Sequence, residues 1–112
     1  MNTIRVADYS RNPGPRYRIE GPHSGEEFRE TLLIPAFECA VGQGERLLVL
    51  LDGVEFGYPT SFLEEAFGGL VRHVNDVEAV ASRLEFVSAD EPLLVDEVRG
   101  YIRDALLPRR NA

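Results

Sequence analysis

Residues 47–51 form an uninterrupted hydrophobic run, which Asp52 and Gly53 end. Such a run predicts a strand that is buried on both faces, because helices cover both faces of a parallel sheet. We therefore expect a central strand here. A polar turn follows it and carries two adjacent hydroxyls, those of Thr60 and Ser61, to the expected start of a helix. The rest of the chain is organised around this strand, turn and helix.

Three longer stretches show the periodicity of amphipathic helices. Their apolar positions are Phe28, Leu32, Ala36, Phe37, Ala40 and Val41, then Leu63, Ala66, Phe67, Leu70, Val71 and Val74, and finally Leu94, Val98, Tyr101, Ile102 and Ala105. Ser24, Ser61 and Ser88 each precede a glutamate by three residues, the spacing of a capping box that begins a helix. Pro35 predicts a kink or a division of the first helix near Leu33, because proline cannot continue the hydrogen-bond ladder.

Polar and apolar residues alternate in two short stretches near the start of the chain, 3–7 and 16–20, on either side of a turn-forming cluster. This pattern predicts a β-hairpin at the edge of the sheet, and residues 83–87 predict a further strand. The order of elements predicts an α/β fold: a mixed sheet of about four strands that opens with the hairpin and packs against three main helices.

The length of 112 residues favours a single domain over residues 1–112, with 1–2 and 108–112 frayed. The chain has 19 acidic residues, 12 arginines and no lysine, which gives a net charge of -7. This balance disfavours binding to nucleic acid or to an anionic membrane and favours a protein or a small ligand. No apolar stretch approaches the roughly 20 residues that cross a bilayer, and the N-terminus does not resemble a signal peptide, so we expect a cytoplasmic protein.

Few residues carry a pattern typical of catalysis. Asp52 follows a strand, where a carboxylate often serves catalysis or binds a metal, although an Asp-Gly pair more often makes a turn. His23, His73 and Cys39 lack the spacing of a metal site, and the apolar pattern around Cys39 predicts a buried thiol. Because no nucleophile is paired with a base, we expect no enzymatic activity, no cofactor and no metal.

Two glycines and two hydroxyls need a separate explanation. Gly68 and Gly69 interrupt the second helix, where each costs about 1 kcal/mol relative to alanine, so we expect another backbone or a partner to approach them closely. Thr60 and Ser61 fit a simple helix N-cap. They equally fit an anion site or a modification site at a helix start, where the helix dipole favours negative charge.

Residues 13–17, 21–29 and 58–70 resemble a STAS-like domain family of unknown function that is found in bacteria and mobile elements. This family is distantly similar to the STAS domains of anti-sigma factor antagonists. The resemblance implies a regulatory protein-binding module that docks a histidine-kinase-like ATPase acting as a serine kinase. In the antagonists, phosphorylation of a hydroxyl at a helix start releases the complex.

The antagonist motif is an Asp, two Ser, a Gly and a Leu, and this chain has Pro59, Thr60, Ser61, Phe62 and Leu63 at those positions. The resemblance thus implies phosphorylation at Thr60 or Ser61. The Asp of the motif, which helps to engage the partner in the antagonists, is Pro59 in this chain. The residues it implies for docking are Tyr58, Pro59, Thr60, Ser61, Phe62, Glu64 and Glu65. The alternative is a domain that binds a small ligand or a nucleotide through an anion site at Ser61. The pattern leaves the partner's identity and the oligomeric state open.

Overall fold

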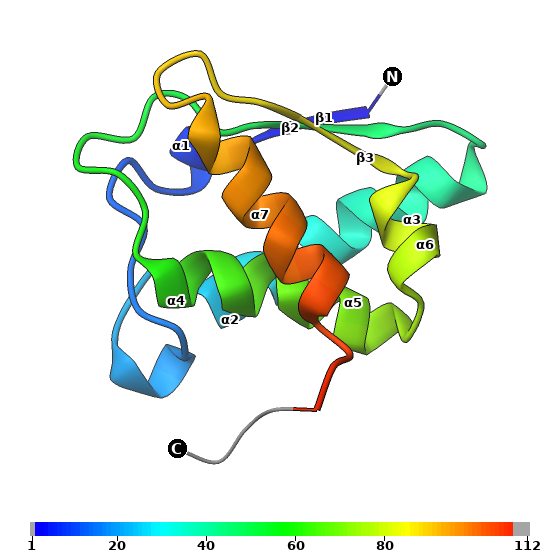
Figure 1. The fold of residues 1–112 in the computed structure, drawn as a ribbon. Coiled ribbons are helices and arrows are strands. Elements are labelled where there is room, and N and C mark those ends of the chain that lie inside the picture. The colour runs from blue at the N-terminus through cyan, green and yellow to red at the C-terminus, as the bar shows by residue number, and fades with distance from the viewer. Residues whose placement is uncertain (1, 109–112) are drawn as a thin grey trace.

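A computed structural model describes residues 2–108 of the chain. It contains, in order, β1 (Asn2–Arg5), α1 (Val6–Tyr9), the 3-10 helix η1 (Arg18–Glu20), α2 (Gly25–Phe28), η2 (Arg29–Leu33), α3 (Ile34–Gly42), β2 (Leu47–Leu50), α4 (Thr60–Leu63), η3 (Glu64–Gly68), α5 (Gly69–Val74), α6 (Val77–Ala81), β3 (Leu84–Val87) and α7 (Leu93–Asp104). η2 and η3 are π-helical turns within two continuous helices, which we call the first helix (25–42) and the central helix (60–74). The predicted α/β class is confirmed (Figure 1).

The three strands are parallel and lie in the order β1, β2, β3. β2 occupies the centre as predicted, but the helices lie on one side of the sheet only (Figure 1). Leu47 and Val49 are fully buried, whereas Leu48 and Leu50, which alternate with them, are half-buried. The sheet is therefore covered on one face, and our prediction that the central strand is buried on both faces is wrong.

The predicted β-hairpin is also wrong, because β1 pairs with β2 and residues 18–20 form η1. Side chains from residues 16–20, the predicted second strand of the hairpin, contact helices instead of a neighbouring strand. The Arg16 guanidinium donates to Glu64 in the central helix at 2.5 Å, and Arg18 donates to Glu30 in the first helix at 3.0 Å. In the part of the chain that the structure describes, the sheet has three parallel strands rather than about four mixed ones.

The predicted fraying concerns residues that lie mostly outside the described range. Of the positions 1–2 and 108–112, the structure describes only 2 and 108. Asn2 belongs to β1, pairs with Leu47 and donates a side-chain hydrogen bond to Gln43 at 3.0 Å.

The π-helical turn η2 explains which side chains of the first helix reach the core. This turn ends at Leu33, two residues before Pro35, whose ring cannot fit a regular helical ladder, so the predicted interruption near Leu33 is confirmed. The extra residue in the turn rotates the helix face, so Leu33 is fully buried whereas Leu32 is exposed. Downstream of the turn, Cys39 is exposed, contrary to our prediction of a buried thiol.

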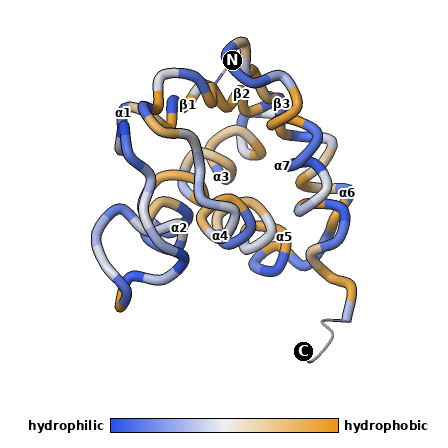
Figure 2. The backbone as a smooth tube through the Cα atoms, turned by 60° about the vertical axis from the view of Figure 1, so that its left-hand side comes forward, coloured by the Kyte–Doolittle hydropathy of each residue, from blue (hydrophilic) through white to orange (hydrophobic). Residues whose placement is uncertain are grey.

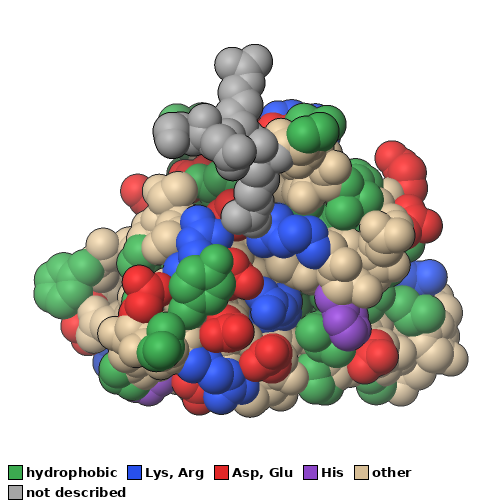
Figure 3. Space-filling view, turned by 90° about the horizontal axis from the view of Figure 1, so that it is seen from below, with side chains coloured by type: hydrophobic (Ala, Val, Ile, Leu, Met, Phe, Trp, Pro, Cys, Tyr) green, Lys and Arg blue, Asp and Glu red, His purple; other side chains and the backbone are tan. Residues whose placement is uncertain are grey.

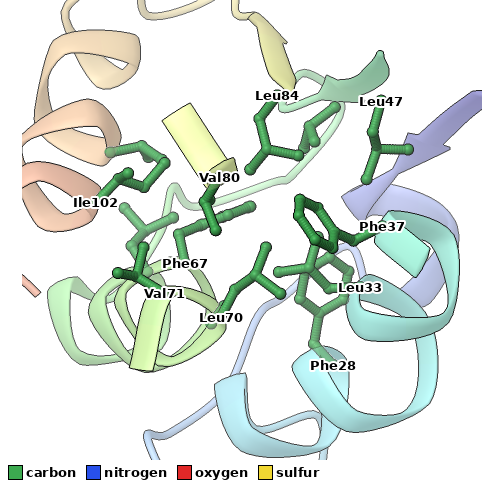
Figure 4. Close-up of a cluster of buried hydrophobic side chains, with 14 of the residues drawn as sticks. Phe28, Leu33, Phe37, Leu47, Phe67, Leu70, Val71, Val80, Leu84 and Ile102 are labelled. Carbon is green, nitrogen blue, oxygen red and sulfur yellow. The ribbon is translucent and has the colours of Figure 1, made fainter. Parts of the chain in front are cut away.

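The central helix packs between the first helix on one side and α7 on the other (Figures 1 and 2). Phe67 of the central helix packs against both the first helix and the sheet. Its ring lies 6.2 Å from that of Phe28 in the first helix and 5.4 Å from that of Phe86 in β3. Figure 4 shows apolar side chains from the helices and the sheet converging at this point. Burying such a side chain contributes about 1.5–3 kcal/mol, so the position of the central helix is firmly determined.

Only one of the three predicted capping boxes begins a helix as expected. The Ser24 hydroxyl accepts a hydrogen bond from the Glu27 backbone N–H at 3.0 Å and caps α2. The Ser88 hydroxyl donates to the Glu91 carbonyl at 2.7 Å, within the turn before α7. At the third box, the central helix begins with Thr60 and has Pro59 as its N-cap residue.

Candidate functional site

The loops that follow β2 and β3 meet at the carboxyl edge of the sheet, beside the start of the central helix. Neighbouring parallel strands place their following loops side by side, which is where ligands bind in many α/β folds. The loop after β2 bends at Gly53 and Gly57, whose φ angles of +98° and +81° suit glycine best. This loop carries the candidate residues from the sheet to the helix.

Asp52 ties the two loops together. Its carboxylate accepts hydrogen bonds from the backbone N–H groups of Ala89, at 2.9 Å, and Asp90, at 2.8 Å. These two hydrogen bonds, with smaller contributions that include the positive charge of Arg5, hold the pKa of Asp52 below its usual value. Both oxygens thus serve a structural clamp, which favours the turn interpretation of Asp52 over a catalytic one.

Tyr58 fixes the end of the same loop against the sheet. Its hydroxyl donates to the Leu51 carbonyl at 2.8 Å, and its ring lies 6.0 Å from that of Phe62. Burial, and then the nearby charge of Asp52, raises the pKa of Tyr58. Tyr58 is therefore a neutral, half-buried support for the start of the helix.

The two candidate hydroxyls occupy different environments. Thr60 is exposed at the first position of the central helix, and Ser61 is partly buried. The Tyr101 phenol in α7 donates to a carboxylate oxygen of Glu97 at 2.7 Å, and the Thr60 hydroxyl lies close enough to that phenol to lower its pKa. Burial and the Glu97 carboxylate raise the pKa of Tyr101, although the Thr60 contact opposes them. Since no side chain caps the helix, the N-cap interpretation of Thr60 and Ser61 is wrong.

Five charged side chains form an ion-pair network below the central helix. Glu65 accepts from Arg29 at 2.6 Å and from Arg16 at 3.2 Å, and Glu64 accepts from Arg16 at 2.5 Å and from Arg72 at 2.8 Å. Figure 3 shows arginine and acidic side chains interleaved on this face. Burial raises the pKa of Glu64, but the hydrogen bonds from Arg72 and Arg16 outweigh it and hold the pKa below its usual value.

The two central glycines make room for this network. A Cβ atom on Gly69 would collide with the Arg29 guanidinium, and one on Gly68 would lie 2.5 Å from a carboxylate oxygen of Glu64. We predicted that another backbone or a partner approaches these glycines. The groups that approach are side chains of the same chain.

The seven residues that we predicted for docking differ in their exposure to solvent. Pro59 and Thr60 are exposed, and Tyr58 and Ser61 are partly exposed. Phe62 has no exposed surface because it packs in the core, and Glu65 is 8% exposed within the ion-pair network. Glu64 is partly exposed and bound to two arginines. The accessible part of the segment is therefore 58–61.

A shallow cavity of about 260 Å³ lies beside this segment, between the two loops. Its lining combines apolar residues with Glu55, Asp90 and Glu91. Sequence reasoning missed this cavity, because the carboxylates come from two loops that meet only in the fold. The acidic lining disfavours an anionic ligand, which weakens the alternative of a nucleotide site near Ser61.

Other candidate chemistry is sparse in the described range. No group of three or more His, Cys, Asp and Glu side chains within residues 2–108 is arranged to hold a metal ion. His23 lies in a turn with a φ of +58°, and His73 is exposed near the end of α5. Within the same range, none of the helices has the length and apolar character needed to span a bilayer.

Comparison with known families agrees with this architecture. Residues 24–94 match the family model described as a STAS-like domain of unknown function. The match runs from the cap of α2 to the start of α7 and includes the whole central helix. The chain therefore belongs to this STAS-like family, as its motifs indicated. No curated protein and no solved structure matches the chain.

Proposed function

We propose that this domain is a regulatory protein-binding module without catalytic activity, and that its docking surface is the start of the central helix. The observation that carries the proposal is the exposure of Thr60 at the first position of a helix whose next turn is buried, in a chain of the STAS-like family. The distant similarity to anti-sigma factor antagonists supports a histidine-kinase-like ATPase as the partner. The docking surface comprises residues 58–61, and Tyr101 supports it from α7.

The switch that we propose is phosphorylation of the Thr60 hydroxyl. A phosphoryl group adds about -1.5 to -2 charge at neutral pH. The Glu97 carboxylate is nearby, because it accepts a hydrogen bond from Tyr101, and the Thr60 hydroxyl lies close enough to Tyr101 to lower the pKa of its phenol. Desolvation of the new charge, together with repulsion by Glu97, would weaken a complex in which Thr60 is covered.

The absence of catalysis is part of the proposal. Both oxygens of the Asp52 carboxylate are occupied by backbone hydrogen bonds, so this side chain is poorly placed to act as a base. Tyr101, the tyrosine near Thr60, has a raised pKa and so stays protonated at neutral pH, and a neutral phenol is a poor proton acceptor. In this proposal, the transfer chemistry comes from the partner.

The test uses the full chain, a histidine-kinase-like ATPase encoded beside it, and ATP. We expect the two proteins to co-elute without ATP. With ATP, we expect the chain to gain one phosphoryl group by intact mass and the complex to dissociate. Thr60→Ala should abolish the mass gain, whereas Ser61→Ala and the control Ser82→Ala, an exposed hydroxyl at the end of α6, should retain it. Absence of both a complex and an adduct would refute the proposal.

A further inference from the structure

Two large hydrophobic side chains protrude at the carboxyl edge of the sheet. Phe56, in the loop after β2, is 88% exposed, and Leu93, the first residue of α7, is 80% exposed. Single exposed apolar residues are common on protein surfaces, but a group of them beside a concave surface marks an interaction site. The question is therefore whether these two side chains belong to one surface.

Two adjoining cavities connect them. Phe56 lines the cavity of about 260 Å³, and Leu93 lines a second one of about 340 Å³. The two cavities share Asp90, Glu91 and Leu94, so they lie on either side of the turn before α7. We call this combined surface the edge groove. Its apolar lining residues are Leu51, Val54, Phe56, Tyr58, Pro92, Leu93 and Leu94.

Among residues 2–108, the charged side chains that line the edge groove are all acidic. They are Glu55, Asp90, Glu91 and Glu97. Glu55 pairs with Arg11 at 3.8 Å, but both side chains are exposed, at 43% and 70%, so solvent screens this pair. The groove therefore combines apolar surface with a local excess of negative charge.

This combination determines which occupant fits. A second copy of the chain would bring a net charge of -7 and the same acidic groove, so like charges would oppose its docking. An anionic ligand meets the same repulsion. A positively charged segment with apolar side chains is complementary in both respects, because its apolar groups can cover Phe56 and Leu93 while its cations contact Asp90 and Glu91.

We propose that the edge groove binds a segment of a protein partner that carries both apolar and lysine or arginine side chains. This inference rests on the proposed function, because Tyr58 belongs both to the groove and to the docking surface. The inference also specifies which side chains the partner uses: a segment with apolar and positively charged side chains binds the groove beside Thr60. Association should accordingly slow and weaken as the salt concentration rises.

The test titrates the isotope-labelled full chain with an amphipathic Leu/Lys peptide of about 15 residues, long enough to form a helix. A Leu/Glu peptide and a Ser/Lys peptide of equal length are the controls for charge and for apolar character. We expect NMR shift changes at residues 54–58 and 88–97 with the Leu/Lys peptide only. Phe56→Ser, and the double variant Asp90→Asn with Glu91→Gln, should each weaken binding by about tenfold or more, as removal of a central contact does.

Matched variants elsewhere on the surface control for general effects. Ile19→Ser removes an apolar side chain that is 94% exposed on η1, and the pair Glu38→Gln with Glu78→Gln removes two exposed charges. Both should bind the peptide like the unmodified chain. Equal binding of the Leu/Glu peptide, shift changes outside the groove, or unchanged affinity in the groove variants would each overturn the inference.

The same variants separate this inference from the proposed function. If the ATPase complex forms and the groove variants leave its affinity unchanged, the inference is wrong and the proposed function stands. If no ATPase complex forms but the Leu/Lys peptide binds the groove as expected, the proposed function is wrong and the groove remains a site for a basic, apolar partner.

Discussion

The Arg29 guanidinium donates to the Glu65 carboxylate at 2.6 Å and, through the same nitrogen, to the Glu65 backbone carbonyl at 2.7 Å. Each side chain is about one tenth exposed, at 12% for Arg29 and 10% for Glu65. The first helix and the central helix are thus joined by a charged pair that is nearly removed from water. Glu65, which we predicted to contact a partner, thus has an arginine of the same chain as its partner in the structure.

Loss of the Glu65 charge should therefore destabilise the domain strongly. Glu65→Gln leaves the Arg29 guanidinium nearly buried without its anion, and breaking such a pair costs about 3 kcal/mol. Urea denaturation should show this loss as a lower midpoint. The control Glu78→Gln, at an exposed position in α6, should stay within about 0.5 kcal/mol of the unmodified protein. Equal midpoints for the two variants would contradict this role of Glu65.

The glycines of the central helix provide a second test of the same network. Gly69→Ala places a methyl group where the Arg29 guanidinium lies, and we expect a loss of about 2 kcal/mol from overpacking and displacement of the ion pair. Gly42→Ala, at the end of α3, meets no atom within 4 Å and should stabilise the chain by about 0.4–1 kcal/mol. Thermal unfolding of the two variants should show shifts of opposite sign. Stabilisation by Gly69→Ala would refute the packing account.

The lowered pKa of Glu64 makes part of the stability dependent on pH. A carboxylate whose pKa is lower in the folded state contributes stability above its unfolded value, near 4.5. That contribution is lost as the pH falls through the lower folded pKa. The free energy of unfolding should thus decrease as the pH falls below about 4.5, and Glu64→Gln should reduce this decrease. An identical pH dependence in the variant would show that the arginines do not stabilise the charged form of Glu64.

Removal of the two hydroxyls at helix starts, those of Ser24 and Thr60, should change the stability of the protein by different amounts. Ser24 is fully buried and caps α2, so Ser24→Ala should cost about 1 kcal/mol. Thr60 is exposed and lies inside the helix, so Thr60→Ala should change stability by less than about 0.5 kcal/mol. Denaturation of both variants distinguishes a capping residue from a surface hydroxyl. A loss at Thr60 as large as that at Ser24 would restore the capping interpretation.

The parts of the fold that the sequence predicted are those encoded by local periodicity. The central strand, the helix face from Leu63 to Val71 and the cap at Ser24 follow from patterns within one or two turns. The π-helical turn at 29–33 is not encoded by a regular helical period, because its inserted residue places Leu33 rather than Leu32 in the core.

The parts that the sequence did not predict depend on contacts between distant segments. Arg16 alternates with apolar neighbours like a strand residue, yet its partner is 48 positions away in the central helix. Glu65 pairs with Arg16 and Arg29, which are 49 and 36 positions away in the sequence. Local patterns carry no information on such pairings.

The most direct test of the proposed docking surface is a co-elution measurement with light scattering. The chain is mixed with the histidine-kinase-like ATPase without ATP, and Thr60→Arg is compared with the control Ser82→Arg. Both positions are accessible at the ends of helices, so both variants should fold. We expect Ser82→Arg to co-elute with the ATPase like the unmodified chain, and Thr60→Arg to elute alone. Equal co-elution of both variants would contradict docking at the start of the central helix.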